Sequence, residues 1–487
     1  MDTKDLLTRT ADIAAMVPYW DKVTCLVEGL DAVRAATTDF LPKFPEEKQD
    51  DYNFRLSYSK YTNVYRDVLE GLATKPFEEE VSLIGGESIP AEAYDFIEDV
   101  DGCGNNLTMF SALTFFNGIN YAIDWIFVDY PTVDPSVVIS REQAKKQNLK
   151  PFWTHVLAKN ILEVRTDNIG SKEVINYIRI FEPAVNKTPD RVRIFNRSDE
   201  GIVTWKLFEK TKKEEFVLIE EGTLSIDTIP LVPFITGRRD GRSFKFFPPM
   251  RDACDLQITL YQEESGLEYI KTMSAYPMLA ANGMRPQKGP DGKTIEKVGI
   301  GPMRVLYGLP GDSGQNGEWK FIEPNANSME FLKKDVDKTK QDLRELGRQP
   351  LTALSTQLTT VTTAIAAGKA RSAVSAWALG LKDCLKNALI ITMKYMNLSY
   401  KPEVNVYTGF DNVLDDGTDL EALDKARARG DLSLETFLAE FKRRKVLSPE
   451  FRFEEESKRI LNEIPSEDWQ ITAISDNNNI NKLRANT

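Results

Sequence analysis

The hydrophobic pattern of the first half of the chain changes from a helical to a strand-like period. Up to about Leu41, apolar residues recur at steps of three and four, which predicts helices interrupted at Pro18. A second helix is predicted from Asp51 to Leu72. It carries three tyrosines on one face, Tyr58, Tyr61 and Tyr65. From Lys172 to Phe234, apolar and polar residues alternate between turn-forming residues, which predicts a series of strands and makes this half α+β.

The second half contains a predicted helix, a small β insertion and another helix. Pro248 and Pro249 suit the first turn of a helix that runs to about Met273. The insertion from Ser274 to Pro324 is rich in Gly and Pro, and its predicted strands lie at 276–282, 303–309 and 318–323. Helical periodicity returns from Asn327 to Gly347.

A charge-free segment and a very long helix follow. No charged residue occurs from Gln349 to Gly368. Apolar residues then hold one helical face from about Thr363 to Leu398, far beyond the usual helix length of about 11 residues. One strand is predicted at Asn405 to Phe410, followed by three charged helices and a flexible, Asn-rich tail over residues 466–487.

Composition excludes some classes of function. The 487 residues include 62 Lys or Arg and 74 Asp or Glu, a net charge of −12, and 41% are hydrophobic. Such a composition is typical of a folded protein. A tight, sequence-independent DNA clamp is not expected, because that binding depends on cations that neutralise phosphates. The short basic clusters, 238–242 and 442–445, are interpreted as surface charge.

The chain offers few candidate chemical groups. It has no GxxxxGK[ST] phosphate loop, no nucleophile-elbow motif and a single histidine, His155, which is interpreted as structural. Its four cysteines are far apart in sequence and are predicted to be reduced and buried. No catalytic residue, cofactor or metal is predicted, and neither a secretory signal nor a transmembrane helix is expected. Carboxylates such as Asp252, Asp255, Glu263 and Glu264 leave a hydrolase open.

Six stretches carry a resemblance to a known family. They are YTNVYRDVLEGLATKPF, INYAIDWIFVDYP, FPPMRDACDLQITLYQEESGLEYI, RVLYGLP, ELGRQPLT with TTAIAAGKARSAVSAWALGLKDCLKNAL, and RARGDLSLETFLAEFKRRKVL. In this order they span most of residues 50–447. Together they resemble the portal proteins of tailed bacteriophages, in a podovirus-like and prophage family otherwise described as a domain of unknown function. None of the stretches is a catalytic signature.

The resemblance implies an α+β subunit of a ring that usually has twelve copies. Its parts would be an α+β wing, a two-helix stem, a small β-containing clip, a channel loop, a long kinked helix and a helical crown. The implied bounds are 1–247 for the wing, 248–273 and 327–347 for the stem helices, 274–326 for the clip, 348–363 for the channel loop, 364–410 for the long helix and returning strand, and 411–487 for the crown.

The family also implies partners and a location. The ring would sit at the portal vertex of a virion after assembly in the bacterial cytoplasm, as the channel for DNA packaging and ejection. Its partners would be other copies of itself, the large terminase motor, head-to-tail adaptor or neck proteins, the major capsid protein and double-stranded DNA that passes without tight binding. No membrane partner is expected.

The residues predicted to face DNA are polar or acidic. Duplex DNA carries a charge about every 1.7 Å, so hydroxyls and carboxylates let it slide where lysines would hold it. The predicted loop residues are Thr352, Ser355, Thr356, Gln357, Thr359, Thr360, Thr362 and Thr363. The predicted acidic stripe is Asp252, Asp255 and Glu263. The alternatives are another phage structural protein of the tail or baseplate, or a carboxylate-based hydrolase.

Overall fold

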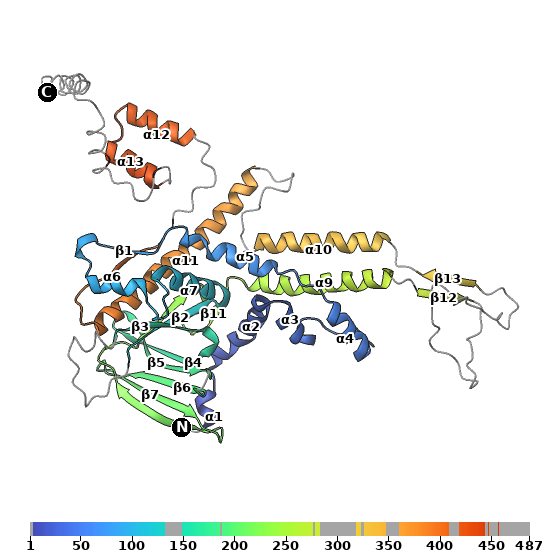
Figure 1. The fold of residues 1–487 in the computed structure, drawn as a ribbon, viewed down its shortest axis with the longest axis horizontal. Helices are drawn as coiled ribbons and strands as arrows, with labels where there is room; N and C mark the ends of the chain where they lie inside the picture. Colours follow the sequence, from blue (N-terminus) through green and yellow to red (C-terminus); the bar gives the residue numbers. More distant parts are fainter. Residues whose placement is uncertain are drawn as a thin grey trace. The chain divides into compact units, whose positions relative to one another are not determined.

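The chain divides into two compact units, Met1–Thr408 and Gly409–Thr487. The computed structural model describes residues 3–131, 149–185, 188–275, 278–282, 318–322, 326–346, 360–408, 418–443, 447 and 456. The first unit combines helices with antiparallel sheets, so the predicted α+β class is confirmed (Figure 1).

The N-terminal helices follow the predicted periodicity, but Pro18 does not interrupt them. The helices are α1 (Thr3–Leu7), α2 (Ala11–Glu28) and α3 (Leu30–Ala35). Helix α2 continues through Pro18, because Met16, Trp20 and Val23 on its inner face are buried and hold both halves in line. The break falls instead at Gly29, whose φ of 104° favours glycine.

The single helix predicted from Asp51 to Leu72 is wrong. The structure has two helices, α4 (Gln49–Tyr58) and α5 (Val64–Ala73), and Asn63 caps α5 by accepting a hydrogen bond from the Arg66 amide. The three tyrosines therefore do not share a face. Tyr58 is 54% exposed at the end of α4, Tyr61 lies between the helices, and Tyr65 is fully buried in α5.

The core of the first unit lies around a three-stranded antiparallel sheet. Its strand order is β3 (Phe152–Val156), β2 (Ile123–Asp129), β9 (Leu231–Ile235). Helix α7 (Leu107–Tyr121) leads directly into β2. Gly118 lets α7 approach β9, because a Cβ there would lie 2.3 Å from the Phe234 ring. The long helix α11 also packs on β2, β9 and α7.

Large aromatic residues fill this core. Trp20, Trp125 and Trp153 are each 1% exposed. The Trp20 indole donates a hydrogen bond to the Tyr121 carbonyl at 2.8 Å, and the Trp153 indole donates to the Thr392 hydroxyl of α11 at 2.8 Å. The apolar rings are therefore buried without leaving these indole N–H groups unpaired.

The strands predicted after Lys172 are four of the five strands of an antiparallel meander, whose first strand precedes Lys172 and was not predicted. Its strands, in spatial and sequence order, are β4 (Ile161–Ile169), β5 (Lys172–Glu182), β6 (Arg191–Arg197), β7 (Val203–Lys210) and β8 (Phe216–Thr223). Leu6 of α1 packs on one face of this sheet with Leu162, Val192 and Ile194. Neighbouring strands pair as hairpins, which explains why alternation alone predicted β5 to β8.

Smaller elements complete the first unit. Strand β14 (Glu403–Asn405) pairs with β1 (Ser82–Ile84). The strand predicted at Asn405 to Phe410 therefore lies earlier in the chain, because it ends at Asn405. Strands β10 (Arg238–Arg239) and β11 (Phe246–Phe247) form a short hairpin. The remaining helices are α6 (Ala91–Glu98) and the 3₁₀ turns η1 (Thr37–Asp39), η2 (Lys75–Phe77), η3 (Gly86–Ser88) and η4 (Ala158–Asn160).

The predicted order of helix, insertion and helix is confirmed. Helix α9 (Arg251–Ala275) is followed by β12 (Met278–Asn282), and β13 (Glu318–Ile322) precedes α10 (Ala326–Leu346). The strand predicted at 303–309 lies outside the described residues. Helix α11 spans Thr360–Tyr395 and therefore begins three residues before the predicted start.

The second unit contains α12 (Thr418–Ala428) and α13 (Leu434–Arg443), at the positions of the first two predicted terminal helices. The rings of Phe437 and Phe441, one turn apart in α13, lie 4.4 Å from each other. The third predicted helix and the predicted flexible tail lie outside the described residues, apart from residue 456.

The cysteine prediction is correct in part. All four cysteines are free, and Cys254 and Cys384 are buried as predicted. Cys103 is exposed and Cys25 is half-buried, so the prediction of burial is wrong for these two. Cys103 lies in the turn between α6 and α7, where the backbone amides bond to Asp101 and no apolar element covers the thiol. Among the described residues, no helix is long and apolar enough to cross a membrane.

Candidate functional site at the α9–α10 helix pair

Helices α9 and α10 lie side by side and carry a two-stranded sheet beyond their ends (Figure 1). Strands β12 and β13 pair in antiparallel register from Met278 opposite Ile322 to Asn282 opposite Glu318. Helix α10 packs against α9, and its apolar residues Val336 and Leu343 are buried. The pair is therefore a two-helix arm that leaves the body and returns to it.

A buried carboxylate joins this pair to the body. Glu264 of α9 is 3% exposed and accepts hydrogen bonds from the Thr62 amide at 2.8 Å and the Thr62 hydroxyl at 2.7 Å. The Lys340 ammonium of α10 lies 2.8 Å from the same carboxylate. Such charge-assisted bonds are directional, so Glu264 fixes the positions of three segments relative to one another.

The same face of α9 makes further polar contacts with the segment between α4 and α5. Gln257 accepts a hydrogen bond from the Tyr65 amide at 2.9 Å and donates one to the Thr62 carbonyl at 3.0 Å. The Tyr261 hydroxyl donates to the Ser59 hydroxyl at 3.0 Å. Gln257, Tyr261 and Glu264 follow the i, i+4, i+7 spacing of one helix face. We call these three residues and Lys340 the polar clasp.

Sequence reasoning missed the polar clasp. Glu264 was noted only as one of many carboxylates, and its partner Thr62 is 202 residues away in the chain. The available signal was an acid and a glutamine at helical spacing beside buried apolar residues. That signal did not identify a partner, so it did not distinguish a buried polar face from an exposed one.

The three residues of the predicted acidic stripe lie in different surroundings. Asp252 is exposed, and Asp255 is 3.5 Å from Lys22 of α2 with 62% of its side chain exposed. Glu263 is half-buried against α10. Burial raises the pKa of Glu263, a hydrogen bond to Thr339 lowers it, and nearby Asp335 raises it. The stripe therefore does not form one continuous acidic surface, because α10 covers its C-terminal part.

The predicted channel loop falls almost entirely outside the described residues. Thr352, Ser355, Thr356, Gln357 and Thr359 are not among them. Thr360, Thr362 and Thr363 belong to the first turn of α11, because the helix begins earlier than predicted. That this segment faces DNA stays a prediction.

His155 takes part in a buried pair in the core. Its Nδ1 lies 3.2 Å from a carboxylate oxygen of Asp124, and its ring stacks on Phe110 with centroids 4.0 Å apart. Asp124 is fully buried, and burial raises the pKa of this carboxyl against the lowering effect of the hydrogen bond with His155. In the described part of the chain, no group of three or more His, Cys, Asp or Glu residues could hold a metal.

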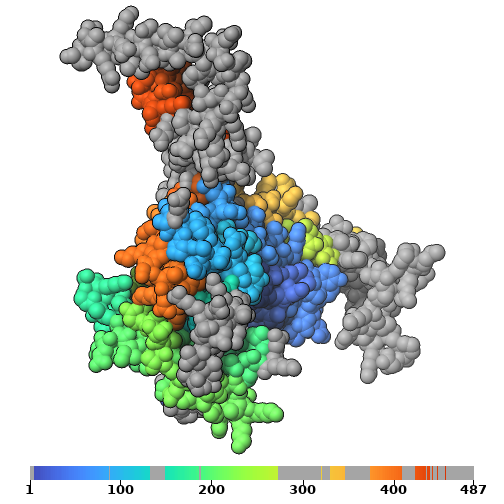
Figure 2. Space-filling view, turned by 60° about the vertical axis from the view of Figure 1, so that its left-hand side comes forward, coloured from blue at the N-terminus to red at the C-terminus, as the bar shows by residue number. Residues whose placement is uncertain are grey.

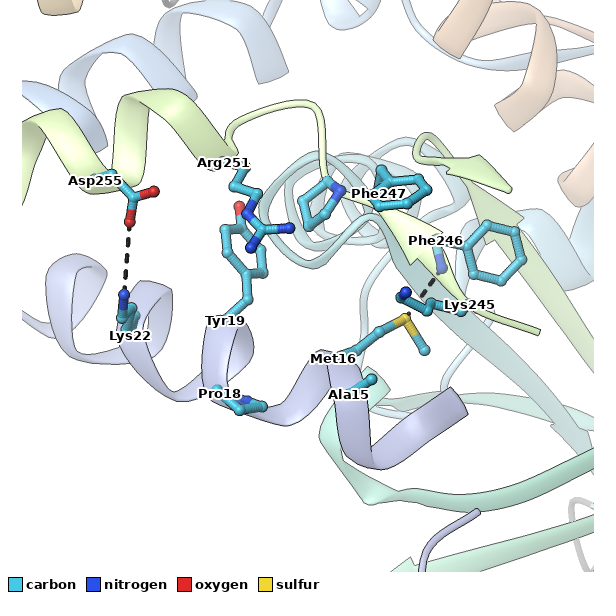
Figure 3. Close-up of a pocket in the computed structure, with 11 residues that line it drawn as sticks. Ala15, Met16, Pro18, Tyr19, Lys22, Lys245, Phe246, Phe247, Arg251 and Asp255 are labelled. Atoms are coloured by element: carbon cyan, nitrogen blue, oxygen red, sulfur yellow. Dashed lines mark hydrogen bonds and ion pairs between the residues drawn. The ribbon is translucent and has the colours of Figure 1, made fainter. Parts of the chain in front are cut away.

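A cavity of about 140 Å³ lies where α2, β11 and the start of α9 meet (Figure 3). Its wall is largely apolar and includes Met16, Tyr19 and Phe246. The charged residues around it are three cations and one acid, Lys22, Lys245, Arg251 and Asp255. This site therefore suits an apolar group that carries negative charge beside it.

A family model matches the part of the chain that contains α9, α10 and α11. Residues 249–396 match the family model DUF4055, a domain of unknown function. The match begins two residues before α9 and ends one residue after α11. Over this region, the match confirms the expected likeness to a family that is described as a domain of unknown function. No curated protein matches the chain.

Three solved structures are similar to this chain at low sequence identity and low TM-score. The neck of a native GTA particle computed with C12 symmetry shares 12% identity at a TM-score of 0.39, covering 82% of this chain and 90% of that one. The virion of a native gene transfer agent (GTA) particle shares 10% at 0.38, covering 82% and 94%. The neck of an empty GTA particle computed with C6 symmetry shares 11% at 0.41, covering 76% and 88%.

Proposed function

We propose that this chain is a structural subunit of a phage virion, and specifically the portal subunit, whose copies close into a ring around a DNA channel. The observation that carries the proposal is the two-helix arm. Helices α9 and α10 leave an α+β body, carry β12 and β13 beyond their ends, and are followed by the 36-residue helix α11. This is the order of parts that the sequence resemblance implies.

Each part of the subunit would form a different region of the ring. The body would form the wing, α9 and α10 the stem, β12 and β13 part of the clip, and α12 and α13 part of the crown. The clip would meet the large terminase motor during packaging and head-to-tail adaptor proteins afterwards, while the body would meet the major capsid protein.

We further propose that the subunit is not an enzyme and that the motor is a separate chain. Two of the four carboxylates that left a hydrolase open, Glu264 and Asp255, have polar partners within this chain. Glu264 is bound by Thr62 and Lys340, and Asp255 is paired with Lys22. Packaging energy would come from an ATPase, since this sequence has no phosphate loop.

Particle mass tests the ring. A ring of twelve copies would have a mass of about 662 kDa, which is 12 times 55.2 kDa. Multi-angle light scattering at high protein concentration in several salts is expected to show a species near this mass. A monomer or dimer under all of these conditions would contradict the ring.

Substitutions in the predicted loop test the channel. Arginines at Thr356 and Thr359 are expected to leave ring assembly unchanged and to slow packaging, because every copy would add positive charge that holds phosphate. The matched control is serine at the same two positions, which keeps the hydroxyls. Heads filled equally fast by both variants would show that the loop does not face DNA.

A further inference from the structure

The cavity between α2, β11 and α9 combines an apolar interior with cations at its edge. Met16, Tyr19 and Phe246 line it, and the Phe246 amide donates a hydrogen bond to the Met16 sulfur at 3.3 Å. Figure 3 shows the side chains of Lys22 and Arg251 beside Tyr19. A 150 Å³ apolar cavity can hold a benzene ring, so about 140 Å³ is of the right order for one aromatic side chain.

The cations of the cavity are weakly engaged within the subunit. Lys22, which is exposed, is 3.5 Å from Asp255, and Lys245, which is half-buried, is 3.1 Å from the exposed Asp240. Arg251 forms no ion pair with the residues that the structure describes. Exposed pairs of this kind contribute little to stability, so these cations can exchange partners at low cost.

One surface of the same chain has the complementary character. Residues 85–101, which include α6, contain six acids and no Lys or Arg. Tyr94 is 44% exposed on α6, and Asp95 and Glu98 beside it are exposed. Figure 2, turned so that the left side of Figure 1 comes forward, shows the azure segment containing α6 at the surface beside α11.

The other exposed aromatic residues fit the cavity less well. In the described part of the chain they are Phe44, Phe54, Tyr58 and Phe331. Each has a Lys or Arg within three positions in the sequence, whereas Tyr94 has none within fifteen. The charged residues nearest to Tyr94 in the sequence are all acids, which matches an apolar cavity surrounded mainly by cations. The one cation paired with this acidic segment is Lys150, which lies 3.5 Å from Asp99, among the residues that the structure describes.

We propose that the cavity receives Tyr94 of a second copy of this chain, with Asp95 and Glu98 of that copy facing Lys245 and Arg251. The inference rests on the proposed ring and names one of its subunit contacts. Figure 1 shows α6 on one side of α7 and the cavity elements α2 and β11 on the other. A contact between two different surfaces of identical subunits is the kind that closes a ring.

Charge reversal on each side tests the contact. Arg251→Glu with Lys245→Glu, or Asp95→Lys with Glu98→Lys, is expected to raise the protein concentration for half-assembly by about tenfold in light scattering. The two pairs combined are expected to restore assembly. Both Arg251, at the start of α9, and Glu98, at the end of α6, accept the reversed charge favourably with respect to the helix dipole, so these two changes should not destabilise their helices.

Matched controls separate this contact from general effects. Lys213→Glu, in the exposed turn between β7 and β8, adds the same kind of charge change away from the cavity and is expected to leave assembly unchanged. Tyr94→Ala is expected to weaken assembly, and Tyr58→Ala, at a tyrosine that is 54% exposed, is not. Thermal melts of all variants verify that they are folded.

The possible results distinguish this inference from the proposed function. If the parent protein never forms rings, the proposed function fails. If the parent forms rings and the reversed-charge variants assemble at the parent concentration, or the combined variant does not recover, the contact is wrong. If the cavity variants assemble normally but lose binding to linear duplex DNA in a filter assay, the cavity meets phosphates and the contact is also wrong.

Discussion

The core around β2 and the α9–α10 arm are held by different kinds of contact. In the core, Trp125, Trp153 and Phe115 are almost fully buried among apolar neighbours. Where the arm joins the body, the central contacts are hydrogen bonds and an ion pair made by Gln257, Tyr261, Glu264 and Lys340. Apolar packing tolerates small shifts, whereas the polar contacts require a particular geometry, so the arm is joined in one defined orientation.

The largest effect is expected from truncation in the core. Trp125→Ala removes a fully buried indole from β2 and should lower the free energy of unfolding by about 3–5 kcal/mol. Urea denaturation followed by circular dichroism measures it. The control Leu379→Ala, at a side chain of α11 that is 53% exposed, should change stability by less than about 0.5 kcal/mol. Equal effects of the two variants would contradict the assignment of the core.

A smaller, local effect is expected from the polar clasp. Glu264→Gln leaves Lys340 without its carboxylate and should cost about 2 kcal/mol, because Lys340 is 24% exposed and partly solvated. Amide hydrogen exchange should speed up in α10 and the Ser59–Asn63 segment, while β2 keeps its protection. Glu268→Gln, one turn further along α9 and more exposed, is the matched control.

Global loss of protection in the Glu264→Gln variant would contradict the separation between arm and core. Unchanged amide hydrogen exchange in α10 would show that the ion pair between Glu264 and Lys340 does not help to hold α10 in position. The double variant Glu264→Gln with Lys340→Met removes both charges and should recover part of the loss, since it leaves no unpaired ammonium.

The smallest effect is expected from an ion pair that joins the five-stranded sheet to β10. The Arg239 guanidinium and a hydrogen bond from Thr166 hold the pKa of Glu173 at about 2, below its usual 4.5. Because the folded pKa is the lower one, this stabilisation is present above pH 4.5 and is lost as the pH falls towards 2. Glu173 is 41% exposed, so the contribution should be under about 1 kcal/mol.

Unfolding of Glu173→Gln across this pH range checks the prediction. The variant should lose less stability than the parent between pH 4.5 and 2, and the two should converge at the acidic end. Glu220→Gln, on the exposed edge strand β8, should follow the parent. Parallel curves for the parent and Glu173→Gln would show that the ion pair does not stabilise the fold.

Local patterns predicted the elements whose structure depends on local contacts. Alternation predicted β5 to β8 because each strand pairs with its neighbour in sequence. Periodicity and Pro248 predicted α9 and α10 to within three residues. Both cases depend on one buried face and one exposed face, which a sequence displays directly.

Long-range polar contacts explain what the sequence did not predict. The pattern of tyrosines continued across Ser59–Asn63, but the chain leaves the helix there, where Arg34 and Tyr261 bond to Ser59 and Glu264 bonds to Thr62. Likewise, the spacing of the acidic stripe was right, yet Glu263 is half-buried because α10 covers it. Neither the polar partners of Ser59 and Thr62 nor the contact between α10 and Glu263 can be identified from the sequence of a single helix.

Electron microscopy of the purified full-length chain tests the central claim most directly. At a concentration where light scattering shows a large species, averaged end-on views should show closed rings with a central opening, and side views should show a narrower part built from the α9–α10 arms. Open filaments, irregular clusters or single subunits in the same sample would contradict the proposal that this chain is a portal-type ring subunit.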